Sequence, residues 1–128
     1  MKNIGLEKEM KDHFFYAAEH LFKEEQKVEA APLYRYIIDR ETDHNDQTFL
    51  LCHFRLFQCL VGISSDGNKE ALGRFEPFYS HLPEDNQLDA LLLTANVSYS
   101  LGDWNRVERY GDELHTLSKN VYHNRPVD

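Results

Sequence analysis

Apolar residues recur at spacings of three and four along almost the whole chain, which is the signature of amphipathic helices. Between Leu6 and Glu25 the recurring apolar positions are Met10, Phe14, Ala17, Ala18 and Leu21. The same spacing predicts five further helices, over residues 28–41, 47–63, 68–82, 86–101 and 103–119. No alternation typical of strands and no hairpin dipeptide competes with this pattern. The sequence therefore predicts an all-α protein.

The ends of these helices carry their own signals. Asp46 immediately precedes the third helix and is a good N-cap residue, because its carboxylate can accept a hydrogen bond from the first turn. Pro32 lacks an N–H and predicts that the regular part of the second helix begins near it, and Pro77 predicts a kink in the fourth. Residues 120–128 are polar and contain a proline, so we expect a frayed tail.

The predicted helices form three similar pairs. The pairs break at residues 24–27, 64–68 and 101–104, and a small or β-branched residue leads each second helix: Ala30, Ala71 and Val107. Ala18 and Ala95 each lie twelve residues before their partners Ala30 and Val107. Small residues let paired helices approach closely, and one pair alone cannot bury its apolar face. Three pairs that share one interior are therefore expected.

This pattern resembles the tetratricopeptide repeat, a helix-turn-helix unit of about 34 residues. The turn Leu101-Gly102-Asp103-Trp104 is the best single match. The resemblance implies a single domain over residues 1–128, built as a short right-handed α-solenoid from repeats 6–41, 46–82 and 84–119. Gly111 departs from the pattern, because an aromatic residue is common at that place in the family.

The stretch from Phe54-Arg55-Leu56-Phe57 to Phe75-Glu76-Pro77, followed by residues 87–92, is similar in style to the repeat region of peptide-sensing regulators of Gram-positive bacteria. In that family a helix-turn-helix DNA-binding domain precedes the repeats. No such segment is expected before the first helix here. The resemblance thus implies the sensor or oligomerisation region of a cytoplasmic transcription regulator, with a peptide or protein ligand and a possible homodimer.

Charge and composition narrow the classes further. The formal net charge is −8, which argues against direct nucleic-acid binding by this segment and is compatible with a basic partner. No apolar run approaches the length of about 20 residues that spans a bilayer, and residues 1–11 lack a signal peptide. Cys52 and Cys59 lie seven apart on one predicted helix, about 10 Å along its axis, which is too far for a disulfide. A cytoplasmic location is expected.

The resemblance places a ligand groove on the first helix of each pair. It implies groove positions at Asp89, Leu92, Asn96 and Tyr99 in the fifth helix and at Phe15 and Glu19 in the first. Asn96 leads this set, because an amide can both donate to and accept from a peptide backbone. The alternative for Asn96 is a capping or solvated side chain, and Tyr99 is also a candidate for the core.

The third helix gives independent evidence for a polar face. It is apolar almost all round, yet Thr48, Arg55 and Gln58 fall on one side of it. Arg55 is a candidate for gripping a ligand carboxylate, and the alternative is an internal salt bridge to Asp89 or Glu76. We include Arg55 and Gln58 in the predicted groove.

Catalysis has no positive signal. The seven histidines are scattered, and the chain contains no His-Glu-x-x-His, no Cys-x-x-Cys and no phosphate loop, so no metal and no cofactor are expected. The alternative function is a freestanding scaffold that self-associates through the open ends of its stack. Charged residues of the first and sixth helices would then act as polar caps, in the sixth helix Arg106, Glu108, Arg109, Asp112 and Glu113.

Overall fold

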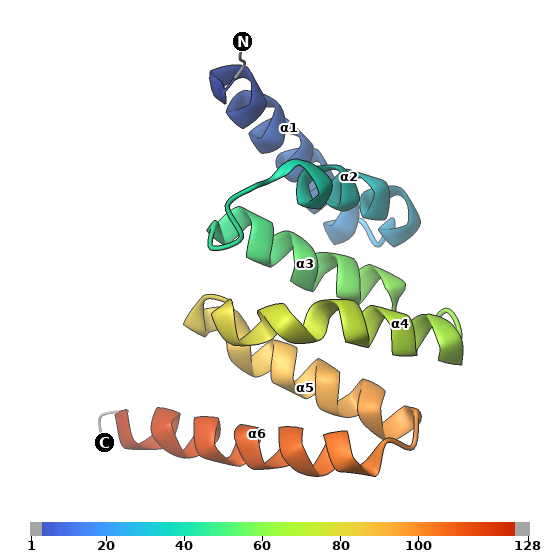
Figure 1. Cartoon of the computed structure of the whole chain (residues 1–128), viewed down its shortest axis with the longest axis vertical. Coiled ribbons are helices and arrows are strands. Elements are labelled where there is room, and N and C mark those ends of the chain that lie inside the picture. The colour runs from blue at the N-terminus through green and yellow to red at the C-terminus, as the bar shows by residue number, and fades with distance from the viewer. Residues whose placement is uncertain (1–3, 125–128) are drawn as a thin grey trace. The chain divides into compact units, whose positions relative to one another are not determined.

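A computed structural model describes the backbone of residues 4–124 and the side chains of residues 8–119, and every regular element in that range is a helix (Figure 1). The elements are α1 (Ile4–Lys23), α2 (Lys27–Arg40), α3 (Gln47–Leu60), α4 (Ser65–Phe75), the 3₁₀ helix η1 (Glu76–His81), α5 (Glu84–Ser100) and α6 (Trp104–Asn124). The all-α prediction is confirmed. Contacts divide the chain into two compact units, residues 1–61 and 62–128, so the predicted second pair has α3 in one unit and α4 in the other.

The first unit consists of α1, α2 and α3, with α2 in contact with both of the others. All three helices contribute to its core, which is built from Ala18, Ala30, Tyr34, Ile37, Cys52, Leu56 and Cys59. Ala18 and Ala30 are fully buried, as expected for small residues where α1 and α2 pack closely. Tyr34 and Ile37, four and seven residues after Ala30, are buried too, which matches the predicted inward face of the second helix.

The second unit contains α4, η1, α5 and α6, and α5 lies between α4 and α6 (Figure 1). One side of α5 is buried, through Ala90, Leu91, Thr94, Val97 and Ser98. Within α6, Tyr110 is fully buried, although the repeat alignment places Gly111 at the inward position. Among the described helices, none has both the length and the apolar content that crossing a bilayer requires.

The same backbone turn joins α1 to α2 and α5 to α6. After α5, the N–H of Gly102 donates to the carbonyl of Tyr99 and that of Asp103 to Ser98, both at 3.0 Å. After α1, the N–H of Glu25 donates to Phe22 at 3.1 Å and that of Gln26 to Leu21 at 2.9 Å. Both are Schellman motifs, which require a residue with positive φ, here Gly102 (71°) and Glu25 (62°). The two turns align Ala18 with Ala95 and Ala30 with Val107, in the register that the sequence repeat predicts.

The other helix ends can be compared with the ends that the sequence predicts. The Asp46 carboxylate caps α3 by accepting from the N–H of Phe49 at 3.0 Å, as predicted. Helix α2 begins at Lys27, five residues before Pro32, so the prediction that regular helix starts near Pro32 is wrong and this proline lies inside α2. Ser64 caps α4, which therefore starts before the predicted residue 68. Helix α6 continues to Asn124, beyond the predicted end at residue 119, and residues 125–128 of the predicted frayed tail lie outside the described part.

Pro77 changes the type of helix rather than only bending it. The α-helical hydrogen bonding of α4 ends at Phe75, and η1 follows directly over Glu76–His81 with Pro77 at its start. Proline has no N–H to continue the α-helical ladder, and its fixed φ suits the first turn of a new helix. The switch places Glu76 and Tyr79 on a short element that contacts α5 and meets side chains of α6.

Candidate functional site

Four of the predicted groove residues gather on one exposed side of α5. We define the outer face of α5 as Leu88, Asp89, Leu92, Asn96 and Tyr99, which are all exposed. Leu92 keeps 46% of its surface in solvent and Tyr99 keeps 66%. Because the opposite side of α5 is buried, this helix is apolar on two sides. An apolar surface left in water on an otherwise packed helix is a candidate contact site.

The turn after α5 extends this face by one aromatic residue. Trp104, the single tryptophan of the chain, begins α6 and is 61% exposed. Its ring meets that of Tyr99 edge to face, with centroids 5.4 Å apart. The left-handed backbone of Gly102 reverses the chain between them, so the sequence Tyr99–Trp104 itself builds the pair. Tyrosine and tryptophan supply large contact areas at low entropic cost and are enriched at binding surfaces.

Three of the predicted groove residues of the first unit, Glu19, Arg55 and Gln58, form a polar network with one another. The Arg55 Nε lies 3.0 Å from Glu19 Oε2, and Arg55 Nη1 donates to Gln58 Oε1 at 3.0 Å. The buried Tyr34 hydroxyl also donates to Glu19 Oε2. Burial, and then the Glu19 carboxylate, raise the pKa of Tyr34, so the phenol stays protonated and keeps its proton toward Glu19.

The sequence left two interpretations of Arg55 open, a ligand contact and an internal salt bridge, and the structure contains an internal salt bridge. The partner in this salt bridge is Glu19 of α1, a residue that the sequence had not proposed for it. Arg55 also lies 4.9 Å above the ring of Phe22, while Phe15 packs half-buried against the core of the first unit. Glu19 and Gln58 thus occupy the Nε and Nη1 donors of this guanidinium.

The equivalent positions of the two hairpins differ in what covers them. In the register set by the two turns, Phe15, Glu19 and Phe22 of α1 correspond to Leu92, Asn96 and Tyr99 of α5. In the first unit, α3 supplies Arg55 to the α1 positions, as described above. In the second unit, Asn96 is exposed, and its side chain makes no hydrogen bond to another described residue. The positions on α1 are therefore partly covered by α3, whereas the equivalent positions on the outer face of α5 are exposed.

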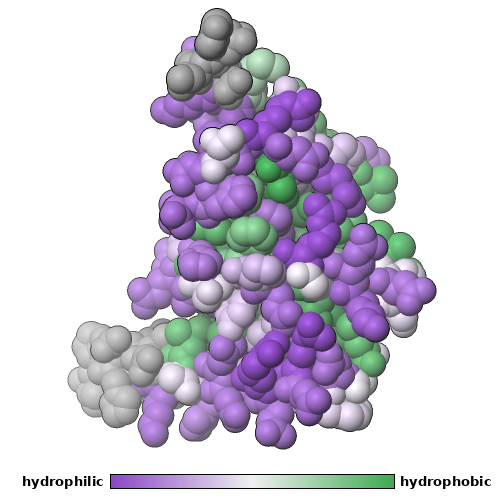
Figure 2. Space-filling view, in the orientation of Figure 1, coloured by the Kyte–Doolittle hydropathy of each residue, from purple (hydrophilic) through white to green (hydrophobic). Residues whose placement is uncertain are grey.

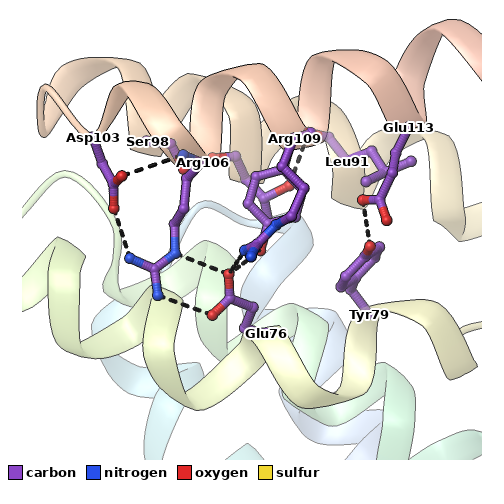
Figure 3. Close-up of polar contacts among 10 residues, drawn as sticks. Glu76, Tyr79, Leu91, Ser98, Asp103, Arg106, Arg109 and Glu113 are labelled. Atoms are coloured by element: carbon purple, nitrogen blue, oxygen red, sulfur yellow. Dashed lines mark hydrogen bonds and ion pairs between the residues drawn. The ribbon is translucent and has the colours of Figure 1, made fainter.

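A second polar cluster fastens η1 to α6 (Figure 3). The Glu76 carboxylate accepts from Arg106 Nε at 2.9 Å and Nη2 at 3.0 Å, from Arg109 Nη2 at 2.5 Å, and from the Tyr110 hydroxyl. These donors, Arg106 first, lower the pKa of Glu76 to about 2. Asp103 adds a contact of 2.6 Å to Arg106 Nη1 and caps α6 through the N–H of Arg106.

For the alternative function, a self-associating scaffold, the sequence analysis expected Arg106, Arg109 and Glu113 to belong to a polar cap. In the structure Arg106 and Arg109 turn to Glu76, and Glu113 accepts a hydrogen bond from Tyr79 of η1 (Figure 3). The signal was present as spacings of three and four between Arg106, Arg109, Tyr110 and Glu113, which set them on one side of a helix. Nothing in the sequence paired that side with Glu76. The cluster positions α6 and offers no reactive group.

The cysteines add no reactive site among the described residues. Cys52 and Cys59 are free thiols in the core of the first unit, and burial raises the pKa of Cys59 to about 11. Within residues 8–119, histidine, cysteine and carboxylate side chains form no group suited to hold a metal ion. Searches against models of protein families, curated proteins and solved structures found no match to this chain.

Proposed function

We propose that this chain is a tetratricopeptide-like module that binds a peptide or protein on the outer face of α5. The observation that carries the proposal is the exposed strip of Leu88, Leu92 and Tyr99 with the Trp104 ring beside it. Apolar and aromatic side chains at this density favour a macromolecular partner over water. Asn96 lies within the strip and can hold a peptide backbone through its amide.

The two Schellman turns support the repeat interpretation that underlies this proposal. They place α1–α2 and α5–α6 in the same register, with Glu25 and Gly102 at equivalent points. Repeated helical hairpins are typical of modules that bind extended partners. We further propose that the three predicted pairs stack as a short right-handed solenoid, and that the chain is the sensor or oligomerisation region of a bacterial transcription regulator in the cytoplasm.

A phage-displayed library of random linear peptides tests the binding surface. Synthetic copies of enriched peptides would be titrated calorimetrically into the protein, the Tyr99→Ala variant and the Asn96→Ala variant. We expect at least tenfold weaker binding to Tyr99→Ala, because an aromatic anchor at the centre of an interface contributes about 2 kcal/mol or more. Tyr16→Ala is the matched control, since Tyr16 of α1 is 80% exposed and lies outside the face.

Three results would contradict the proposal. The library would yield no binder to the folded protein, or its binders would have the same affinity for Tyr99→Ala as for the unaltered chain. Equal loss of affinity in Tyr16→Ala would also count against the outer face of α5, because it would place the ligand elsewhere.

Self-association is the second candidate, and two side chains of the first unit favour it. Tyr16 of α1 and Val28 of α2 are 80% and 79% exposed, so each presents apolar surface that a second copy of the chain could cover. The visible surface of α6 is mostly hydrophilic by contrast (Figure 2), with Glu108 and Asp112 exposed. Sedimentation equilibrium of the chain and of Val28→Asp tests this candidate. A dimer that Val28→Asp dissociates supports it, and a monomer at all concentrations contradicts it.

A further inference from the structure

The second unit contains a hollow that the proposed function does not use. It has a volume of about 360 Å³, within the range of about 300 to 1,000 Å³ usual for ligand pockets. It lies between η1, α5 and α6 and is lined by Tyr79, Ser80, Gln87, Leu91, Asp112, Glu113, Thr116 and Leu117. Leu91 faces away from the outer face of α5, so this hollow is a separate site.

Its polar groups are mostly acceptors, because the donors of Gln87, Tyr79 and Thr116 are already engaged and only the exposed Ser80 hydroxyl adds another. The Gln87 amide donates to the carbonyls of Leu82 at 2.9 Å and Ser80 at 3.3 Å, which leaves its oxygen available. The Tyr79 hydroxyl donates to Glu113, and the Thr116 hydroxyl to the carbonyl of Asp112 at 3.0 Å. Two carboxylates remain on the lining, and its described residues include no lysine, arginine or histidine.

The hollow combines apolar walls with acidic side chains that are more exposed to solvent. Leu91, Leu117 and the Tyr79 ring provide carbon surface, while Asp112 is exposed and Glu113 is half-buried. This arrangement matches a long side chain with an aliphatic stem and a cationic head, since such side chains bury the stem and keep the charge on polar partners. The net charge of −8 favours the approach of such a group.

A larger hollow in the first unit does not have this excess of negative charge. It has a volume of about 500 Å³ and is lined by both signs of charge. Lys11 pairs there with Glu41 at 2.7 Å and Asp46 at 3.5 Å, and the Arg40 guanidinium stacks on the Tyr36 ring at 3.6 Å. Its charged groups largely satisfy one another, so it selects no ligand class.

We propose that the hollow between η1, α5 and α6 binds the lysine or arginine side chain of a peptide partner. The peptide is the partner class of the proposed function, and the pocket adds a preference for basic sequences. The cationic head contacts Asp112 and Glu113, and the stem lies against Leu91 and Leu117.

Methyl NMR of isotope-labelled leucines tests the pocket directly with the capped tripeptides Ac-Ala-Lys-Ala-NH₂ and Ac-Ala-Nle-Ala-NH₂. The norleucine peptide has the same stem without the ammonium group. We expect saturable shifts of the Leu91 and Leu117 methyl signals with the lysine peptide and none with the norleucine peptide. Asp112→Asn should weaken binding about fivefold, as removal of one partly exposed charge partner does. Glu108→Gln removes the same charge outside the pocket and should leave the affinity unchanged.

Each other outcome overturns the inference. Equal shifts with both peptides would show an apolar patch, and no shift at millimolar concentrations would show no site. Equal weakening in Asp112→Asn and Glu108→Gln would show attraction by overall charge alone. Pentylamine that binds as tightly as the lysine peptide would assign the pocket to free amines. Because these methyl groups lie away from the outer face of α5, a negative result here leaves the phage-display test intact, and the reverse also holds.

Discussion

The cluster at Glu76 makes the sharpest stability prediction. Replacing Glu76 with Gln keeps one acceptor oxygen and the side-chain shape but removes the charge that Arg106, Arg109 and Tyr110 surround. In the folded chain the pKa of the Glu76 carboxyl is lowered from 4.5 to about 2. A lowering of about 2.5 means that the charged carboxylate stabilises the fold by at most roughly 3 kcal/mol. Arg106 and Arg109 are 32% and 56% exposed, so solvent screens the pair and we expect a loss of about 1 to 2 kcal/mol at pH 7.

The pH dependence gives this prediction its signature. A carboxylate whose folded pKa is lowered stabilises the fold above its unfolded pKa near 4.5, and that contribution is lost as the pH falls toward 2. The difference in unfolding free energy between the unaltered chain and Glu76→Gln should therefore be constant from pH 7 to about 5. It should shrink below about pH 4.5 and approach a minimum near pH 2.

Urea unfolding followed by circular dichroism at a series of pH values measures this difference. Glu70→Gln is the matched control, because Glu70 lies on the exposed side of α4 and should change the free energy by less than about 0.5 kcal/mol. A difference for Glu76→Gln below that level at pH 7, or one that does not change between pH 5 and the acid limit of folding, would refute the reasoning.

Three further predictions use the turns and the thiols. Glu25→Gly should raise the unfolding free energy by about 0.5 to 1 kcal/mol, because glycine adopts the φ of 62° without strain. Thermal melting measures this change, and a lower melting temperature for the variant would contradict the prediction. Gly102→Ala, at the equivalent turn, should lower the unfolding free energy by about 1 kcal/mol. An unchanged melting temperature would show that alanine adopts the φ of 71° without strain. Cys52 and Cys59 should react with a thiol-labelling reagent only when urea unfolds the chain, since both are buried and their pKa values are raised; rapid labelling of the folded protein at pH 8 would disprove this.

The sequence predicted the helices well because their signals are local. The spacing of Ala18, Ala30, Tyr34 and Ile37 identified the inward faces, and Asp46 identified the start of α3. Pro32 misled because a proline in the second turn of a helix removes a hydrogen bond without ending the helix when the surrounding residues pack. The break at residues 24–27 was predicted, but nothing marked Glu25 as the residue with positive φ, since the Schellman turn there uses a residue other than glycine.

The site was predictable only in the part that depends on one helix. Asp89, Leu92, Asn96 and Tyr99 lie together because a helix places them on one side, whatever packs around it. The partner of Arg55 and the donors to Glu76 depend on contacts between residues 30 or more apart, and neither spacing nor composition specifies those. The pocket between η1, α5 and α6 likewise arises only when three elements meet.

Trp104 fluorescence tests the central claim, that the outer face of α5 binds a peptide or protein. Trp104 is the single tryptophan and its ring lies beside Tyr99 on that face, so a ligand bound there removes water from the indole. We expect a saturable blue shift of its emission when a phage-selected peptide is added, with the midpoint that calorimetry gives. Binding detected by calorimetry without any change in Trp104 emission would contradict the claim.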